Sequence, residues 1–269
     1  AQIHGELDQL EEANQIYQVA LETSVSAFGE SDATTLSVLD NYGGFLNSID
    51  PEMSESVLQE ALRLTTEDDP QRASRLRVLG LNLQELGRTG EAEVMLSEAL
   101  KAYKKVLGEN SPETLSSMAD LAQLYLTQGK LKPAQELFET ALPLMLEVMK
   151  KTSFLILTSK ENLAEIYRQQ GKFSLAEKLF LESMQGAVAE YGEEDSLVIQ
   201  SRSHLAQLYE DTGKLNKALL LHQQVYEADL ALLGEAHPNT AGDLNNLASV
   251  RRRLGDYQKA EKLFRKSLK

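Results

Sequence analysis

The feature that constrains this chain most is a unit of 42 residues that recurs along it. A glycine marks each of five successive units; a leucine and a small residue come before it, and an alanine comes after it. The glycines are Gly87, Gly129, Gly171, Gly213 and Gly255. The leucines are Leu79, Leu121, Leu163, Leu205 and Leu247, each followed directly by glycine or alanine. Several columns in register over five units predict one structural element that is repeated.

Each unit has the periodicity of two helices. Apolar residues recur at steps of three and four in 121–125 and again in 137–142, and no run alternates as a half-buried strand does. Glycine between the two stretches can adopt a left-handed helix cap, and the small residue lets the two helices approach closely. A single hairpin cannot bury both of its apolar faces. The sequence therefore predicts an all-α fold, a right-handed superhelical solenoid of antiparallel helix pairs.

The order of small and large residues in each unit resembles the tetratricopeptide repeat. In one unit this order reads Leu163-Ala164, Tyr167, Gly171, Ala176 and Phe180. The period is longer than the roughly 34 residues usual for that family, and the extra length falls in the second helix and the loop after it.

The loop that follows the second helix indicates which type of tetratricopeptide repeat the chain resembles. It reads Gly-Glu-x-x-Pro-x-Thr in 108–114 and in 234–240, and proline suits a first helical position because its missing amide would be unbonded there. This loop and the run Asn245-Asn246-Leu247-Ala248 are similar to the kinesin-light-chain type of tetratricopeptide array. The likeness is to a repeat type and does not imply motor transport.

We expect one solenoid over residues 1–269, with about seven units. The predicted boundaries are a partial unit 1–29, a degenerate unit 30–69, the units 70–112, 113–154, 155–196 and 197–238, and a partial unit 239–269. Gly43 and Gly44 should weaken the first helix of the degenerate unit by roughly 1 kcal/mol each. Because the repeats at both ends are incomplete, we expect a fragment of a longer protein.

The search for catalytic chemistry is negative at the level of the sequence. The chain has no cysteine, which excludes disulfides, thiolate zinc sites and cysteine nucleophiles. Its four histidines lack metal-ligand spacing, and there is no nucleophile elbow or phosphate-binding glycine loop. His222 takes the place of Phe138 and Phe180 in the repeat and should be a core residue. We therefore expect no enzyme activity, no catalytic residue, no metal site and no cofactor.

Net charge is −14 and unevenly distributed, at −14 in 1–70, −6 in 71–250 and +6 in 251–269. An acidic chain argues against nucleic acid as a partner, and no apolar run is long enough for membrane insertion. The charge gradient has two interpretations: solvated helix faces, or ends that attract different partners, including self-association of the acidic N-terminal part with the basic C-terminal part. We expect an intracellular, cytoplasmic protein, with an organelle lumen left open.

The surface predicted for binding is the concave side, which the first helix of each unit should line. Polar side chains surround the leucine that recurs in each repeat, and asparagine and glutamine can form hydrogen bonds with the backbone of an extended peptide. The predicted peptide-binding residues are Asp120, Gln123, Asn162, Glu165, Arg168, His204, Gln207, Asn246, Ser249, Arg252 and Arg253. The family resemblance implies the same role: a groove that holds short linear motifs of partner proteins, in part through Asn162 and Asn246.

The predicted groove is acidic in its middle, where Asp120, Glu161, Glu165, Glu210 and Asp211 should lie. This charge favours basic or neutral peptides and argues against a clamp for the C-terminal carboxylate of chaperone tails. Arg252 and Arg253 could hold a carboxylate at the far end, or face the acidic ends of further repeats.

The function expected from these features is a non-catalytic scaffold that binds peptide segments of protein partners. Two alternatives stay open. The array could be the regulatory arm of a larger signalling protein, or a head-to-tail oligomerisation module that is sensitive to salt.

Overall fold

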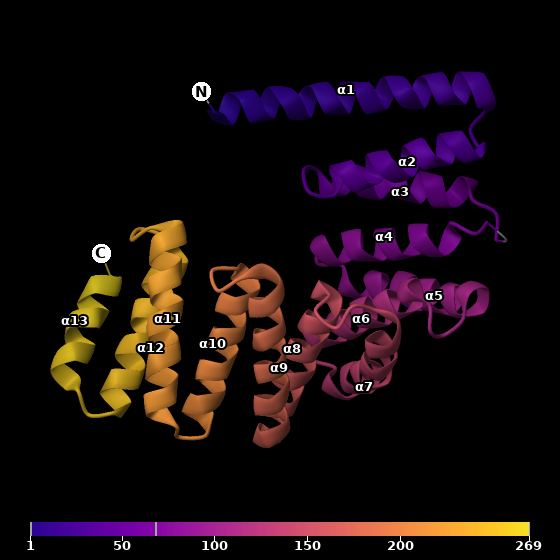
Figure 1. The fold of residues 1–269 in the computed structure, drawn as a ribbon. Coiled ribbons are helices and arrows are strands. Elements are labelled where there is room, and N and C mark those ends of the chain that lie inside the picture. Colours follow the sequence, from indigo (N-terminus) through magenta and orange to yellow (C-terminus); the bar gives the residue numbers. More distant parts are fainter. Residues whose placement is uncertain (1, 68, 269) are drawn as a thin grey trace. The chain divides into compact units, whose positions relative to one another are not determined.

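The structure, a computed structural model, describes residues 2–67 and 69–268, with side chains from Leu10 onward. Within these residues there are thirteen helices and no strand, which confirms the all-α prediction (Figure 1). The chain divides into two compact units, one that ends at Leu137 and one that begins at Phe138. Each unit is described by itself below.

The first unit holds α1 (Gln2–Phe28), α2 (Ala33–Leu46), α3 (Pro51–Leu64), α4 (Arg72–Glu85), α5 (Thr89–Leu107) and α6 (Pro112–Thr127). Helix α7 (Leu131–Val148) begins in the first unit and ends in the second. The second unit continues with α8 (Phe154–Gln169), α9 (Phe173–Tyr191), α10 (Ser196–Asp211), α11 (Leu215–Leu233), α12 (Pro238–Arg253) and α13 (Tyr257–Ser267).

Helices pack in consecutive pairs inside each unit. In the second unit α8 pairs with α9, α10 with α11 and α12 with α13, and each second helix also packs on the first helix of the next pair. One core cluster shows the result: Phe180 of α9, Leu205 and Tyr209 of α10, and Val250 of α12 are all buried together. The apolar face that one hairpin leaves open is covered by its neighbour, as in a helical-hairpin stack.

The small residue after each leucine is where the two helices of a pair meet. Ala122, Ala164, Ala206 and Ala248 have no solvent exposure. At Gly80 a β-carbon would lie 2.8 Å from Leu96 Cγ, so nothing larger fits without displacing that leucine.

The first helix of the repeat predicted to be degenerate forms, although it contains two adjacent glycines. Helix α2 runs through Gly43 and Gly44 to Leu46. A β-carbon on Gly43 would come 2.5 Å from Leu58 Cδ2, which shows that the position is needed for the close approach of α3. The packing of Leu58, which is 1% exposed, opposes the low helix propensity of the glycines.

The turn inside each pair repeats one set of contacts. Gly129, Gly171 and Gly213 have φ between +71° and +73°, a left-handed conformation that favours glycine. The lysine that follows each glycine places its Nζ 5.3 Å from the ring centre of a tyrosine of the preceding helix: Lys130 on Tyr125, Lys172 on Tyr167 and Lys214 on Tyr209. Burial, together with a hydrogen bond to Glu177, raises the pKa of Tyr209 to about 12, so this ring stays neutral at physiological pH.

The loop between pairs explains the threonine of the sequence pattern. The hydroxyls of Thr35, Thr114 and Thr240 each donate to the carbonyl of the loop glycine six residues earlier, at 2.7 to 2.8 Å. All three threonines are fully buried. The loop before α10 lacks this bond because Val198 stands in the threonine position.

Arg75 fixes the irregular connection before α4. Its side chain is 4% exposed and its guanidinium binds Asp40 through two nitrogens, at 2.8 and 2.9 Å. It also donates to Thr65 and to Asp69, which lie in the segment between α3 and α4. Five donors in a planar fork make arginine suited to this role.

Thr240→Val should lower the free energy of unfolding by about 1 kcal/mol, because the carbonyl of Gly234 loses its hydroxyl donor while side-chain volume is kept. Urea unfolding monitored by circular dichroism measures this change. Val198→Thr is the reciprocal control and should cost much less, since the added hydroxyl can reach the carbonyl of Gly192. Equal costs for the two variants would contradict the role assigned to the threonine.

Arg75→Met should destabilise the first unit by about 2 to 3 kcal/mol, since it leaves the carboxylates of Asp40 and Asp69 without their charged donor. Amide hydrogen exchange should show the loss mainly in α2, α3 and α4. Arg63→Met is the control, because Arg63 pairs with Glu60 on an exposed surface and should contribute little. A similar effect of both variants would contradict this account of Arg75.

Candidate functional site

Nine of the eleven predicted peptide-binding residues lie on α8, α10 and α12, the first helices of the second unit. We call the surface of these three helices the first-helix face. It carries Asn162, Glu165 and Arg168 on α8, His204 and Gln207 on α10, and Asn246, Ser249, Arg252 and Arg253 on α12. Asp120 and Gln123 lie on α6 in the first unit.

Ion pairs and hydrogen bonds 43 residues apart connect neighbouring first helices. On the first-helix face Arg168 binds Asp211, and His204 Nδ1 lies 3.0 Å from Glu161. Arg253 Nη1 donates to Glu210 at 2.7 Å. In the first unit Arg77 binds Asp120 in the same register. These contacts join α4 with α6 in the first unit, and α8 with α10 and α10 with α12 in the second unit.

The acidic residues predicted for the middle of the groove are therefore paired. Glu165 accepts two hydrogen bonds from Arg168 at 2.8 Å, and Glu161, which is 3% exposed, also accepts from Ser201. The Arg168 guanidinium and a bond from Gln169 hold the pKa of Glu165 below its usual range despite burial, which alone would raise it. Arg168 is shared by Glu165 and Asp211, so part of this negative charge is compensated within the second unit.

His222 is buried, at 2% exposed, as predicted from its place in the repeat. Its Nε2 lies 2.9 Å from Glu210 Oε1, so the histidine keeps a polar partner inside the core. Glu210 is thus shared between His222 and Arg253. His237 instead caps the N-terminus of α12, where its ring nitrogen accepts from the amide of Asn239.

Three predicted residues have exposed polar groups that make no side-chain hydrogen bond within the part of the chain that the structure describes. They are Gln207, Asn246 and Arg252. Ser249 is half-buried, as are Gln123 and Asn162. Arg251 and Arg253 have acidic partners, Asp256 and Glu210, so Arg252 is the one of the three consecutive arginines that leaves its charge to solvent.

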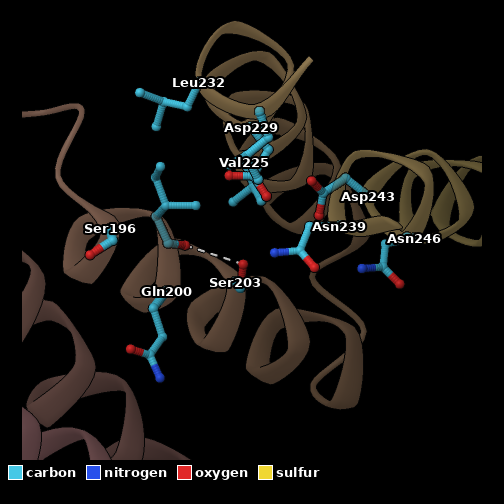
Figure 2. A pocket seen from close by; sticks show the side chains of 12 residues that line it. Ser196, Gln200, Ser203, Val225, Asp229, Leu232, Asn239, Asp243 and Asn246 are labelled. Carbon is cyan, nitrogen blue, oxygen red and sulfur yellow. Dashed lines mark hydrogen bonds between the residues drawn. The ribbon is translucent and has the colours of Figure 1, made fainter. Parts of the chain in front are cut away.

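A cavity of about 500 Å³ opens between α10, α11 and α12 (Figure 2). Its apolar wall is formed by Ile199, Val225, Leu232 and Leu233. The polar side chains around it include Gln200, Ser203, Asn239 and Asn246, so it adjoins the predicted binding residues on α12.

Two carboxyl groups face each other at this cavity. Asp229 of α11 and Asp243 of α12 are 9% and 8% exposed, and Figure 2 shows their side chains turned toward one another. Asp243 Oδ2 is buried and has no donor within the described residues. Burial, and next the charge of Asp229, raise the pKa of Asp243 to about 7. Asp243 is therefore mostly protonated below about pH 7 and mostly ionised above it.

Sequence reasoning missed this pair, although the repeat register contains a signal for it. Asp229 stands 42 residues after Ala187 and 84 after Met145, which are both fully buried. Asp243 follows Ser201 by 42 residues in a column that is also buried. An aspartate at a position that is buried in the other repeats is expected to have a carboxyl group shielded from solvent.

Asp243→Asn should alter the pH dependence of stability in a defined direction. The folded pKa of about 7 lies above the ordinary value, so the folded chain binds more protons than the unfolded chain between about pH 4 and 7. This contribution is complete at low pH and is lost as the pH rises through 7. Urea midpoints of parent and variant should therefore diverge with rising pH, with the variant relatively more stable at pH 8 than at pH 5.

The exposed Glu194→Gln is the control for this titration. Its difference from the parent should stay nearly constant between pH 5 and 8. A difference for Asp243→Asn that is equally flat would contradict the raised pKa of Asp243.

None of the helices in residues 2–67 and 69–268 combines the length and the apolar character that crossing a membrane requires.

Comparison with known proteins identifies the repeat. The tetratricopeptide repeat profile matches residues 71–147 and 155–231, and a second tetratricopeptide repeat profile matches 244–269. No curated protein sequence matches the chain.

Solved structures share the fold. BtubC (BKLC) from P. vanneervenii is 24% identical with a TM-score of 0.66, over 92% of this chain and 89% of that one. A putative kinesin light chain of Podospora anserina with nearly identical TPR-like repeats is 24% identical with a TM-score of 0.65, over 74% of this chain and 95% of that one. The apo form of RapI is 14% identical with a TM-score of 0.71, over 99% and 93%. The family profiles together cover more than half of the residues, and the chain belongs to the tetratricopeptide repeat family.

Proposed function

We propose that this chain is a non-catalytic scaffold whose first-helix face binds extended peptide segments of partner proteins. The observation that carries the proposal is the contrast on that face between paired and unpaired polar groups. Arg168, His204 and Arg253 are occupied by contacts between helices, whereas Gln207, Asn246 and Arg252 point their polar groups at solvent.

The two sets have different roles in this proposal. The paired residues fix the spacing of α8, α10 and α12, so little ordering of the surface is needed when a peptide binds. The unpaired amides of Gln207 and Asn246 offer both donors and acceptors, which suits the backbone of an extended chain. Recognition through the backbone holds a peptide and leaves sequence preference to the side chains beside it.

The pairing of the acidic residues changes the expected charge preference. Asp120 and Glu165 bind Arg77 and Arg168, so they contribute less negative potential than the sequence alone indicates. Arg252 supplies an accessible positive charge on α12, and we propose that it binds an acidic side chain or a carboxylate of the partner.

The test is a peptide-display selection on the parent and on the variant Gln207→Glu with Arg252→Glu. Peptides enriched on the parent should bind this variant at least tenfold more weakly, because the variant removes one amide donor and reverses one charge on the first-helix face. Fluorescence anisotropy of labelled peptides measures the change in Kd.

The matched control is Gln185→Glu with Lys178→Glu on α9, which changes net charge by the same amount on exposed positions of a second helix. Its Kd values should stay within twofold of the parent. Equal loss in both variants would indicate a non-specific charge effect, and enriched peptides that bind both variants as well as the parent would exclude the first-helix face as the binding surface.

A further inference from the structure

The cavity between α10, α11 and α12 carries negative charge that the protein does not balance. Glu161, Glu165 and Glu210 on the first-helix face all have a cationic or histidine partner. Asp229 and Asp243 have no cation within ion-pair distance among the described residues, and they are the two titratable side chains among the twelve residues that line the cavity. Two buried carboxyls with no cationic partner are costly, and a bound cation would offset that cost.

The surroundings of the pair restrict the ligand. An anion would be repelled, and a neutral group would leave the charge of the two carboxyls without a counter-charge. A cation on an apolar stem fits both features of the cavity: its charge meets Asp229 and Asp243, and its methylene groups lie along Val225 and Leu232. The side-chain oxygens of Asn239 and Asn246 can accept further hydrogen bonds from an ammonium or a guanidinium group.

Gly242 lines the cavity without a side chain. Gly242 lies in the interior of α12, and a β-carbon built there would meet nothing within 4 Å. The equivalent position in the three preceding 42-residue repeats is Gln200, Thr158 and Ser116. The exchange to glycine lowers helix propensity and leaves space in front of the carboxyl pair.

We propose that this cavity binds the cationic side chain, lysine or arginine, of a peptide held on the first-helix face, with Asp229 and Asp243 sharing its charge. This inference rests on the proposed function and adds to it a side-chain pocket with a defined preference. The bound cation favours the ionised form of Asp243, which releases its proton on binding.

The test uses the whole chain, labelled with ¹⁵N, and the probe Ac-Ala-Ala-Lys-Ala-Ala-NH2. Two further probes replace the lysine by arginine or by norleucine, which has a similar stem and no charge. The amide resonances of Asn239, Gly242 and Asn246 should shift with the lysine or the arginine probe, and the ratio of their Kd values distinguishes the two cations. The norleucine probe should bind at least tenfold more weakly, and equal binding of all three would overturn the proposal.

Two variants test the site from the protein side. Asp229→Asn with Asp243→Asn should weaken the cationic probes at least tenfold. Gly242→Gln, which restores the residue of the preceding unit, should close the cavity and weaken them to a similar extent without lowering the Tm, so loss of binding cannot be attributed to loss of fold. The control Glu194→Gln with Glu227→Gln removes two charges from exposed positions and should change Kd less than twofold. A loss in the control as large as that in the aspartate variant would assign the effect to net charge and overturn the site.

The pH dependence gives a readout that net charge alone does not produce. A proton competes with the cation for the carboxyl pair, so the lysine probe should bind about tenfold more tightly at pH 8 than at pH 6. Gly242→Gln and the aspartate variant should lose this dependence. A Kd that is independent of pH in the parent would overturn the proposal. The proposal would also be overturned if CaCl2 shifted the same amide resonances and displaced the lysine probe at a concentration below that of the probe.

Failure of this inference can be distinguished from failure of the proposed function. Display peptides that lose binding in the Gln207→Glu, Arg252→Glu variant but retain it in Gly242→Gln, with no enrichment of lysine or arginine, would overturn the pocket and leave the peptide-binding face intact. Display peptides and cationic probes that all fail to bind the parent would overturn both.

Discussion

The close approach of two helices at a residue with almost no side chain is the contact on which the rest of this structure depends. Ala164, Ala206 and Ala248 have no exposure, and Gly80 has no room for a β-carbon. Because the helices of a pair meet there, each hairpin presents a broad apolar face on its other side. That face can be buried only by another hairpin, so the repeat makes the stack and the stack stabilises the repeat. The degenerate unit obeys the same constraint, since Gly43 is kept for Leu58 at the expense of helix propensity.

Stacking also explains why so many charged residues could be placed on one layer of helices. Within a compact unit, successive first helices pack side by side in the same register. A residue of one first helix therefore lies close to the equivalent residue of the first helix in the next repeat. Contacts 43 residues apart, such as Arg168 with Asp211 and Arg253 with Glu210, follow from this geometry. Charged residues that the sequence suggests for ligand binding therefore bind neighbouring helices instead. The free groups that remain, Gln207, Asn246 and Arg252, are the ones available to a partner.

The carboxyl pair illustrates the opposite case, in which an ordinary surface residue type occupies a core position. Asp229 and Asp243 lie on different helices and become neighbours only because α11 packs on α12. Neither residue is part of a recognised sequence motif, and the pattern of acids along the chain gives them no special weight. The raised pKa of Asp243 and the missing side chain at Gly242 together distinguish this repeat from the ones before it.

The sequence by itself determined the elements and their order. Local periodicity, the turn glycines and the loop threonines act over a few residues, so the paired helices of each repeat, the small residues at the helix contacts and the buried His222 could all be predicted from them. The tertiary structure alone decided which polar residues are free. Pairing depends on the register between helices some 43 residues apart and on side-chain direction, and neither is encoded locally. For this reason the residues of the first-helix face could be listed from the repeat, whereas the balance of their charges and the cavity beside Asp243 required the packed helices.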